Sequence, residues 1–302
     1  MRYHVQHLTH YRYAEPALVS LNQIGLTPRD TEHQRVLRHT LRIQPEPHAR
    51  VAWTDAFGNT QIQCCFSEPH EDLRVESVLE VERAAPAHPP LNEGPAWEAA
   101  VGAVREHLKA DTLDALQFVY DSPFVRRSAG FRALAAPDFA AGAPLPAALA
   151  SFAARFKETF TYDTAATQLN TPIEDVLRDR RGVCQDFSHV MIAALRSLGL
   201  AARYVSGYLR TLPPPGKPRL VGADASHCWV SVYAPGWGWI DVDPTNGCLV
   251  SDQHITIAWG RDYSDVTPVK GVILGGSGQS ITVAVDVAPV EENAEEATSS
   301  AG

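Results

Sequence analysis

The stretch that decides the fold of this 302-residue chain reads Arg181-Gly182-Val183-Cys184-Gln185-Asp186-Phe187-Ser188-His189. Apolar residues recur in and beyond it at the spacing of one helix face: Phe187, Val190, Met191, Ala194, Leu195 and Leu198. Gly199 follows directly, and glycine is typical of a helix C-terminus. The pattern predicts a buried helix that begins close to Cys184.

The position of Cys184 in the first turn of this helix has a chemical consequence. A first-turn residue lies near unpaired backbone N–H groups and the positive end of the helix dipole. This setting favours the thiolate, which is the form of cysteine that attacks carbonyl groups. A buried structural thiol is the alternative, because free cysteine is among the most buried residue types.

A β-hairpin is predicted downstream of the helix. Its two strands, residues 224–233 and 239–243, are rich in β-branched and aromatic residues. Residues 234–238 (Ala-Pro-Gly-Trp-Gly) form the turn, and Pro244 ends the second strand. A turn of five residues places Tyr233 opposite Trp239.

This register brings a histidine and an aspartate together. His227 lies diagonal to Asp243 on one face of the hairpin, at a Cα separation of about 7–8 Å. Asp241 shares the face but lies one pair further from His227. A slip of one residue would put His227 and both aspartates on opposite faces, so the inference depends on the turn length. With Cys184, the set has the logic of a nucleophile, a base and a carboxylate that orients the base.

At these residues the sequence resembles the transglutaminase-like superfamily of papain-type thiol enzymes, in particular its bacterial branch of candidate cysteine proteases. The resemblance runs from about Leu145 to about Asn246, in the family's chain order of Cys, His and Asp. The matching segments are Gly182-Val183-Cys184-Gln185-Asp186-Phe187, residues 198–208, Ser226-His227-Cys228-Trp229-Val230 and Asp243-Pro244-Thr245-Asn246-Gly247. Residues 1–13 and 260–266 also resemble parts of this branch, the former its β-rich N-terminal domain.

The resemblance implies an α+β fold. Its core would be papain-like or transglutaminase-like, with the cysteine-bearing helix packed on an antiparallel sheet, and an N-terminal antiparallel β domain would precede it. Cys184 would be the nucleophile, His227 the base and Asp243 the orienting carboxylate.

Two further residues are candidates for the oxyanion or substrate site. Gln185 could donate a hydrogen bond to an oxyanion. The commoner interpretation is an ordinary polar residue in the first turn of a helix. Trp237 could line an acyl-binding groove, or it could simply pack.

The chain is expected to divide at a proline-rich linker. Strand-like alternation before it predicts an antiparallel β module. Its buried face, together with a strand expected at residues 281–287, would form one sheet assembly distinct from the thiol core. Its histidines, His4, His7, His10 and His39, would then be ordinary surface or sheet residues. The expected parts are a β-rich domain (1–84), a linker and helical region (85–144), the catalytic core (145–250), C-terminal strands that could join the N-terminal sheet (251–288) and a disordered acidic tail (289–302).

Composition excludes several classes of function. No apolar stretch approaches the roughly 18 residues of a membrane span, and the N-terminus lacks an apolar signal region. Five cysteines form no even disulfide framework, so a reducing cytoplasm is expected. The net charge of −9 favours neither nucleic acid nor an anionic membrane as a partner.

No metal and no cofactor are expected. Cys184, His189, His227 and Cys228 lack the CxxC or HxxxH spacing of a zinc site, and His189 is more simply a helix-surface or capping residue. A calcium loop of the D-x-D-x-D-G type is also missing from the sequence.

The sequence thus predicts a thiol acyl-transfer enzyme that acts on peptide or carboxamide bonds through a thioester, most simply a hydrolase. A protein-glutamine transglutaminase and a non-catalytic peptide-binding module of the same fold are the alternatives. The peptide or amide substrate, the second oxyanion donor and the oligomeric state stay open.

Overall fold

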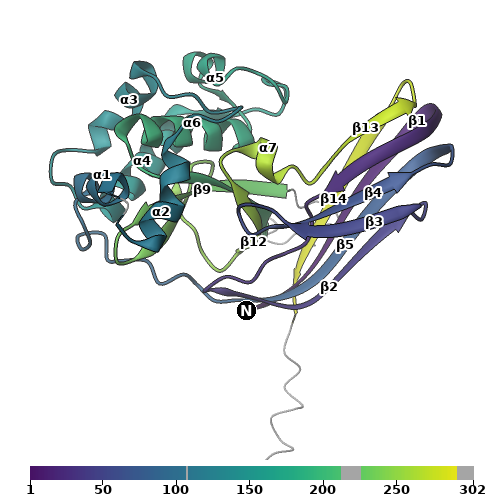
Figure 1. Cartoon of the computed structure of the whole chain (residues 1–302). Helices are drawn as coiled ribbons and strands as arrows, with labels where there is room; N and C mark the ends of the chain where they lie inside the picture. Colours follow the sequence, from purple (N-terminus) through teal and green to yellow (C-terminus); the bar gives the residue numbers. More distant parts are fainter. Residues whose placement is uncertain (107, 212–225, 291–302) are drawn as a thin grey trace, which may run out of the picture.

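The computed structural model describes residues 1–106, 108–211 and 226–290. The first two residues of the expected hairpin strand (224 and 225) and nearly all of the expected acidic tail lie outside these ranges. The described residues form an α/β body that carries the helices and a long curved sheet beside it (Figure 1). No helix in the described ranges has the length and apolar character needed to cross a membrane.

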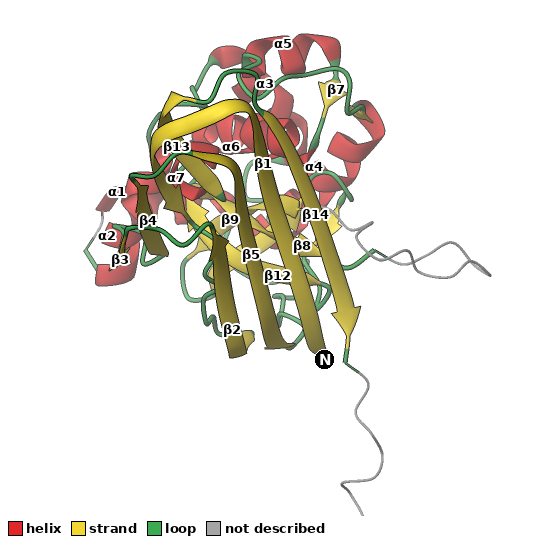
Figure 2. Cartoon of the chain, turned by 90° about the vertical axis from the view of Figure 1, so that its right-hand side faces the viewer, coloured by secondary structure: helices red, strands yellow, loops and turns green. Residues whose placement is uncertain are grey.

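The curved sheet is built around β1 (Arg2–Ile24), whose 23 residues pair with four other strands. Its order is β2-β5-β1-β4-β3, with β13 and β14 also paired to β1. Figure 2 shows the long strands side by side, with β1 flanked by β5 and β14. The other strands are β2 (Gln34–Gln44), β3 (Ala49–Thr54), β4 (Thr60–Phe66), β5 (His70–Arg83), β13 (Val269–Gly275) and β14 (Ser280–Pro289).

The end of the described chain returns to its beginning. β14 runs antiparallel to the first half of β1, from the pair Tyr3 and Pro289 to the pair Arg12 and Ser280. The strand expected near residues 281–287 therefore lies in the N-terminal sheet. The sheet thus contains strands from both ends of the described chain. The alternation of apolar residues predicts such strands but does not identify the strand with which each one pairs.

A second sheet of five antiparallel strands has the order β11-β10-β9-β8-β12. β12 comes from the segment 251–288, whose strands could join the N-terminal sheet, and it pairs with β8 of this core sheet. The strands are β8 (Ala202–Leu209), β9 (Ser226–Ala234), β10 (Gly238–Asp243), β11 (Cys248–Leu249) and β12 (His254–Gly260).

Helix α6 (Cys184–Leu198) packs against β8 and β9. Its residues from Asp186 to Arg196 are all buried, as the apolar pattern predicts. The fold class expected from the sequence is confirmed: a cysteine-bearing helix packs on an antiparallel sheet, and a β-rich N-terminal region precedes it. The remaining helices are α1 (Trp97–Glu106), α2 (Ala110–Leu116), α3 (Ala129–Ala135), α4 (Leu145–Thr159), α5 (Ile173–Asp179) and α7 (Tyr263–Val266).

Short elements complete the core. They are the 3-10 turns η1 (Gln117–Val119) and η2 (Ala136–Asp138), and the two-stranded parallel sheet of β6 (Thr161–Tyr162) with β7 (Arg181–Gly182). The β6–β7 pair holds the segment that leads into α6.

The expectation that the N-terminal module buries its own face apart from the thiol core is wrong. Tyr3 and Val5 of β1, with Val285 and Val287 of β14, belong to the same buried cluster as the apolar face of α6. Only the far half of the sheet has a separate core, which includes Tyr13 and Ile24. The near half therefore packs directly on the core, and the division into domains remains a prediction from sequence.

One of the four N-terminal histidines is also not an ordinary sheet residue. His7 is buried and contacts the core through its Nδ1, which lies 2.8 Å from the hydroxyl of Tyr208 in β8. Its Nε2 lies 2.9 Å from Thr9 Oγ1. Burial lowers the pKa of His7 to about 4, so the ring is neutral near pH 7.

The close approach of β8 and β12 depends on Gly207. A Cβ at this position would lie 2.1 Å from the carbonyl oxygen of Ile255 and 2.6 Å from the ring of Trp229. We predict that Gly207→Ala lowers the free energy of unfolding by at least about 2 kcal/mol. Chemical denaturation measures this change.

Gly102 in α1 supplies the control, because a Cβ there meets nothing within 4 Å. Gly102→Ala should stabilise the protein by about 0.5–1 kcal/mol through helix propensity. Equal effects of the two substitutions would contradict the tight packing at Gly207.

Candidate active site

The N-terminus of α6 is shaped by contacts of Asp186. Its Oδ2 accepts hydrogen bonds from the Val183 backbone N–H at 2.9 Å and from the Thr167 hydroxyl at 2.6 Å. A Cβ on Gly182 would lie 2.7 Å from the same oxygen. Because residue 182 is a glycine, the Asp186 carboxylate has room to bond the Val183 N–H at the N-terminus of α6. Cys184 is then the first helical residue.

The hairpin has the register predicted from its turn. Tyr233 pairs with Trp239, and Val230 pairs with Val242. The Nε2 of His227 lies 2.7 Å from Oδ2 of Asp243. Because Nε2 is engaged by the carboxylate, Nδ1 is the ring nitrogen left for Cys184.

Asp243 is fully buried and accepts several hydrogen bonds. Oδ2 accepts hydrogen bonds from His227 Nε2 at 2.7 Å, His254 Nε2 at 3.1 Å and Asn246 Nδ2 at 2.6 Å. Oδ1 receives the backbone N–H groups of Thr245 at 2.9 Å and Asn246 at 3.1 Å. Burial raises the pKa of Asp243, but these hydrogen bonds outweigh it and hold the pKa far below its usual range.

His254 and Asn246 are members of the site that sequence reasoning missed. Asn246 belongs to the Asp-Pro-Thr-Asn-Gly segment, so a turn in which its amide bonds back to the aspartate was a detectable signal. His254 had no such signal. It reaches Asp243 only because β12 crosses to the far edge of the core sheet beside β8.

Cys184 and His227 shift each other's protonation. The hydrogen bond with Cys228 is the largest influence on the pKa of Cys184 and lowers it. Burial raises this pKa, and His227 lowers it further, so that the pKa falls to about 5. Burial lowers the pKa of His227, but Asp243 and Cys184 outweigh it and raise the pKa to about 10. Near pH 7 the two groups are therefore a thiolate and an imidazolium.

Cys228 has a role that the sequence did not suggest. Its buried thiol accepts a hydrogen bond from the Ser188 hydroxyl at 3.6 Å. Burial, and then the neighbouring Cys184, raise the pKa of Cys228 far above its usual value. Cys228 thus remains a thiol and stabilises the Cys184 thiolate by hydrogen bonding to it.

One group of side chains in the described ranges has the proximity of metal ligands. The ligand atoms of His227, Asp243 and His254 lie within 4.8 Å of one another. Both imidazoles direct Nε2 at the same carboxylate oxygen, at hydrogen-bonding distance. These contacts account for the cluster as a means of holding the His227 ring, and a metal bound to His227 Nε2 would displace Asp243 from it.

His189 does not lie on the helix surface, which was one of the two roles expected for it. It is buried, stacks on Phe124 and accepts a hydrogen bond from the Tyr263 backbone N–H at 3.1 Å, at the start of α7. Burial lowers the pKa of His189 to about 4, so it serves as a neutral acceptor.

The two remaining site candidates differ in position. Gln185 follows Cys184 in the first turn and is half-buried, so it remains a candidate oxyanion donor. Trp237 is not near the triad: it lies in the turn beyond Ala234, whereas His227 begins the same strand. Seven residues of extended chain separate that turn from His227 by about 23 Å. Trp237 lines a different cavity.

Comparison with known proteins agrees with this architecture. Residues 3–82 match the model of the bacterial transglutaminase-like N-terminal region, and residues 135–244 match that of the transglutaminase-like superfamily. An uncharacterized protein of Mycobacterium tuberculosis is 41% identical over 301 residues, covering 97% of this chain and 94% of that protein.

Two other proteins extend the comparison. A protein-glutamine gamma-glutamyltransferase of Pseudomonas aeruginosa is 36% identical over 96 residues, which is 29% of this chain and 14% of that enzyme. The crystal structure of a candidate cysteine protease from Cytophaga hutchinsonii superposes with a TM-score of 0.73, at 21% identity, over 97% of this chain and 92% of that one. This last likeness shows a shared fold.

The shifted protonation of Cys184 predicts its reactivity. Alkylation of Cys184 by iodoacetamide should rise through a midpoint near pH 5, because the thiolate forms there. Cys64 is buried and Cys248 is exposed, and desolvation raises the pKa of both thiols, so both should react only at higher pH than Cys184. Mass spectrometry of labelled peptides measures each rate separately.

The Cys184→Ser variant identifies the fast-reacting thiol in this experiment. If Cys184 labels no faster than Cys64 and Cys248 between about pH 6 and 7, the thiolate assignment is wrong.

Proposed function

Because the chain belongs to the transglutaminase-like superfamily, we propose that it is a thiol-dependent acyl-transfer enzyme acting on peptide or carboxamide bonds. The nucleophile is Cys184, the acid and base is His227, and Asp243 orients the imidazole. The observation that carries this proposal is the geometry: Cys184 begins α6, and His227 is hydrogen-bonded at 2.7 Å to the buried carboxylate of Asp243. In this arrangement the pKa of Cys184 is lowered to about 5, with Cys228 as the largest cause and His227 adding to it.

In the acylation step, the Cys184 thiolate attacks the carbonyl carbon and a C–S bond forms. The negative charge moves to the carbonyl oxygen. When the tetrahedral species collapses, the C–N bond breaks, and the amine leaves with the proton that His227 donates. A thioester and a neutral imidazole remain.

In deacylation, the neutral His227 takes a proton from the incoming nucleophile. Water gives a carboxylic acid product, and a primary amine gives a new amide; both restore the thiolate and the imidazolium. The anion of Asp243 keeps the ring oriented throughout and stabilises its charged form.

The oxyanion requires hydrogen-bond donors placed in advance. The backbone N–H of Cys184 at the start of α6 is free of the helical hydrogen-bond pattern and is the first donor. Gln185 is the candidate for the second. Such donors typically contribute several kcal/mol to the stability of the transition state.

Water is the proposed acceptor, which makes the enzyme a protease or amidase. Transamidation is the second candidate, supported by the similarity of about a third of the chain to the Pseudomonas aeruginosa protein-glutamine gamma-glutamyltransferase. The non-catalytic peptide-binding alternative gives no reason for a thiol held ionised beside a histidine and a buried aspartate.

A substrate screen tests the proposal. Peptide, isopeptide and carboxamide substrates would be incubated with the protein, with and without an added primary amine, and the products identified by mass spectrometry. We expect Cys184-dependent release of the amine in water, and a Cys184→Ala variant should be inactive. Incorporation of the added amine in place of hydrolysis would favour the transglutaminase, and the absence of a thioester with every substrate class would contradict acyl transfer.

The two aspartates of β10 should differ in their effect on turnover. Asp243→Asn should lower kcat by about 10²- to 10⁴-fold, because the imidazole loses its orienting anion. Asp241→Asn should cause a much smaller loss, since Asp241 contacts Trp229 and not His227. Steady-state kinetics with circular dichroism as a check on folding separates the two effects, and the reverse ranking would refute the assigned carboxylate.

A further inference from the structure

A cavity of about 790 Å³ lies on the core sheet, away from Cys184. Its walls come from six parts of the chain: the loop after β1, the turn between β3 and β4, the proline-rich linker, the α2–η1 region, the core strands and the turn between β9 and β10. Known small-molecule sites have volumes of about 300–1,000 Å³ and often lie where such regions meet. No step proposed for Cys184 uses this cavity.

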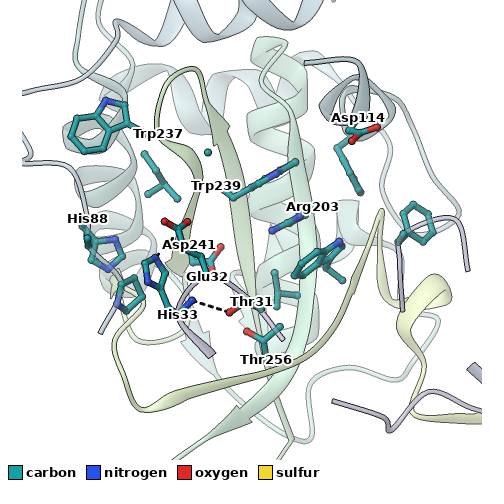
Figure 3. Close-up of a pocket in the computed structure, with 18 of the residues that line it drawn as sticks. Thr31, Glu32, His33, His88, Asp114, Arg203, Trp237, Trp239, Asp241 and Thr256 are labelled. Carbon is teal, nitrogen blue, oxygen red and sulfur yellow. Dashed lines mark hydrogen bonds and ion pairs between the residues drawn. The ribbon is translucent and has the colours of Figure 1, made fainter. Parts of the chain in front are cut away.

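Arg203 of β8 is the central charged residue of the cavity (Figure 3). The side chain is only 8% exposed, and its Nε is buried without a hydrogen-bond partner. The guanidinium lies 3.9 Å from the ring centres of both Trp239 and Trp259. No hydrogen bond or ion pair of this guanidinium is found within the described ranges.

The aromatic contacts explain how Arg203 is held but not how its charge is compensated. Arg29 lies 3.2 Å from the Trp259 ring centre, so a second cation stands near the same stack. A buried cation normally has a hydrogen-bonded anion, because the loss of hydration costs several kcal/mol. Burial, with Arg29 adding to it, lowers the pKa of Arg203 to about 9 despite the attraction of Asp241.

Asp241 supplies a complementary unsatisfied atom in the same cavity. Its Oδ2 accepts a hydrogen bond from Trp229 Nε1 at 3.3 Å, whereas Oδ1 is buried without a donor. Asp241 influences Arg203 electrostatically, but the two do not approach within the 4.0 Å of an ion pair. Both side chains thus line the cavity, and each keeps one buried polar atom, Arg203 Nε and Asp241 Oδ1, that the other does not satisfy.

Arg203 is opposite Ser231, and Ser231 is opposite Asp241, so the two Cα atoms lie about 10 Å apart. A ligand that bridges the two side chains needs an anion toward Arg203 and a cationic N–H donor toward Asp241. An α-amino acid zwitterion has this pairing: its carboxylate matches the guanidinium in the bidentate way that arginine favours, and its ammonium matches Asp241 Oδ1. Trp237, Trp239 and Phe118 also line the cavity and offer aromatic surface to a side chain.

From these observations we propose that the cavity is a second ligand site, distinct from Cys184, that binds a free amino acid with an aromatic side chain. Arg203 binds the carboxylate and Asp241 the ammonium group, while Trp237 covers the side chain at the rim. The site shares β10 with Asp243, two residues away, so ligand binding occurs on a strand of the candidate active site.

Calorimetry with the full chain tests the proposal, using L-phenylalanine and L-tryptophan as probes. We expect saturable binding with one site per chain. N-acetyl-L-phenylalanine lacks the ammonium and L-phenylalanine amide lacks the carboxylate, so each should bind at least about tenfold more weakly. Binding should be unchanged in a Cys184→Ala protein, which separates this proposal from the proposed catalysis.

Three variants locate the binding. Arg203→Lys should weaken binding of the zwitterion by about tenfold or more, because the planar fork is lost. Trp237→Ala should also weaken it, and this side chain is 46% exposed, so its removal does not open the core. Arg178→Gln is the matched control, since Arg178 is exposed on α5 away from the cavity.

The proposal is overturned if neither probe binds at millimolar concentration, because the arginine and tryptophan stack would then be purely structural. It is also overturned if both probes bind equally well to folded Arg203→Lys and Trp237→Ala proteins. Equal binding of the amide and the zwitterion would contradict the role of Arg203.

Discussion

The buried carboxylate of Asp243 is the constraint on which the candidate active site depends. A fully buried anion is stable only if its lone pairs are filled, and here two histidines, an asparagine side chain and two backbone N–H groups fill them. The charge in turn keeps His227 protonated, and the protonated ring helps to keep Cys184 a thiolate. Three separate elements, the start of α6, the hairpin and β12, must therefore meet at one point.

The N-terminal sheet contributes to this point through β12. Arg83 Nε donates to the carbonyl of His254 at 2.9 Å, and Gln34 pairs with the backbone of Thr256 through both its amide nitrogen and its oxygen. These contacts hold the strand that carries His254. Since His254 bonds to Asp243, the sheet supports the site without supplying a group that reacts. This explains physically why the near half of the sheet shares its core with α6.

The sequence predicted the elements whose signals are local. Helical periodicity after Cys184 and the five-residue turn before Trp239 predicted the cysteine helix and the hairpin register, and thereby the contact of His227 with Asp243. The sequence did not predict the contact of His254 with Asp243, because that contact depends on the pairing of β12 with β8. It also did not predict the burial of His7 and His189. The length of β9 separates Trp237 from His227, so Trp237 lines another cavity although both residues belong to the same hairpin. Alternation also does not identify a strand's partner: within residues 251–288, β13 and β14 pair with β1, whereas β12 pairs with β8.

The most direct test of the account is the protonation of His227 in the resting protein, measured by nitrogen NMR of the imidazole ring. The account predicts that both ring nitrogens carry protons near pH 7, with deprotonation only near pH 10. A ring that is neutral near pH 7 and titrates close to the unperturbed value of about 6.5 would contradict the thiolate–imidazolium pair.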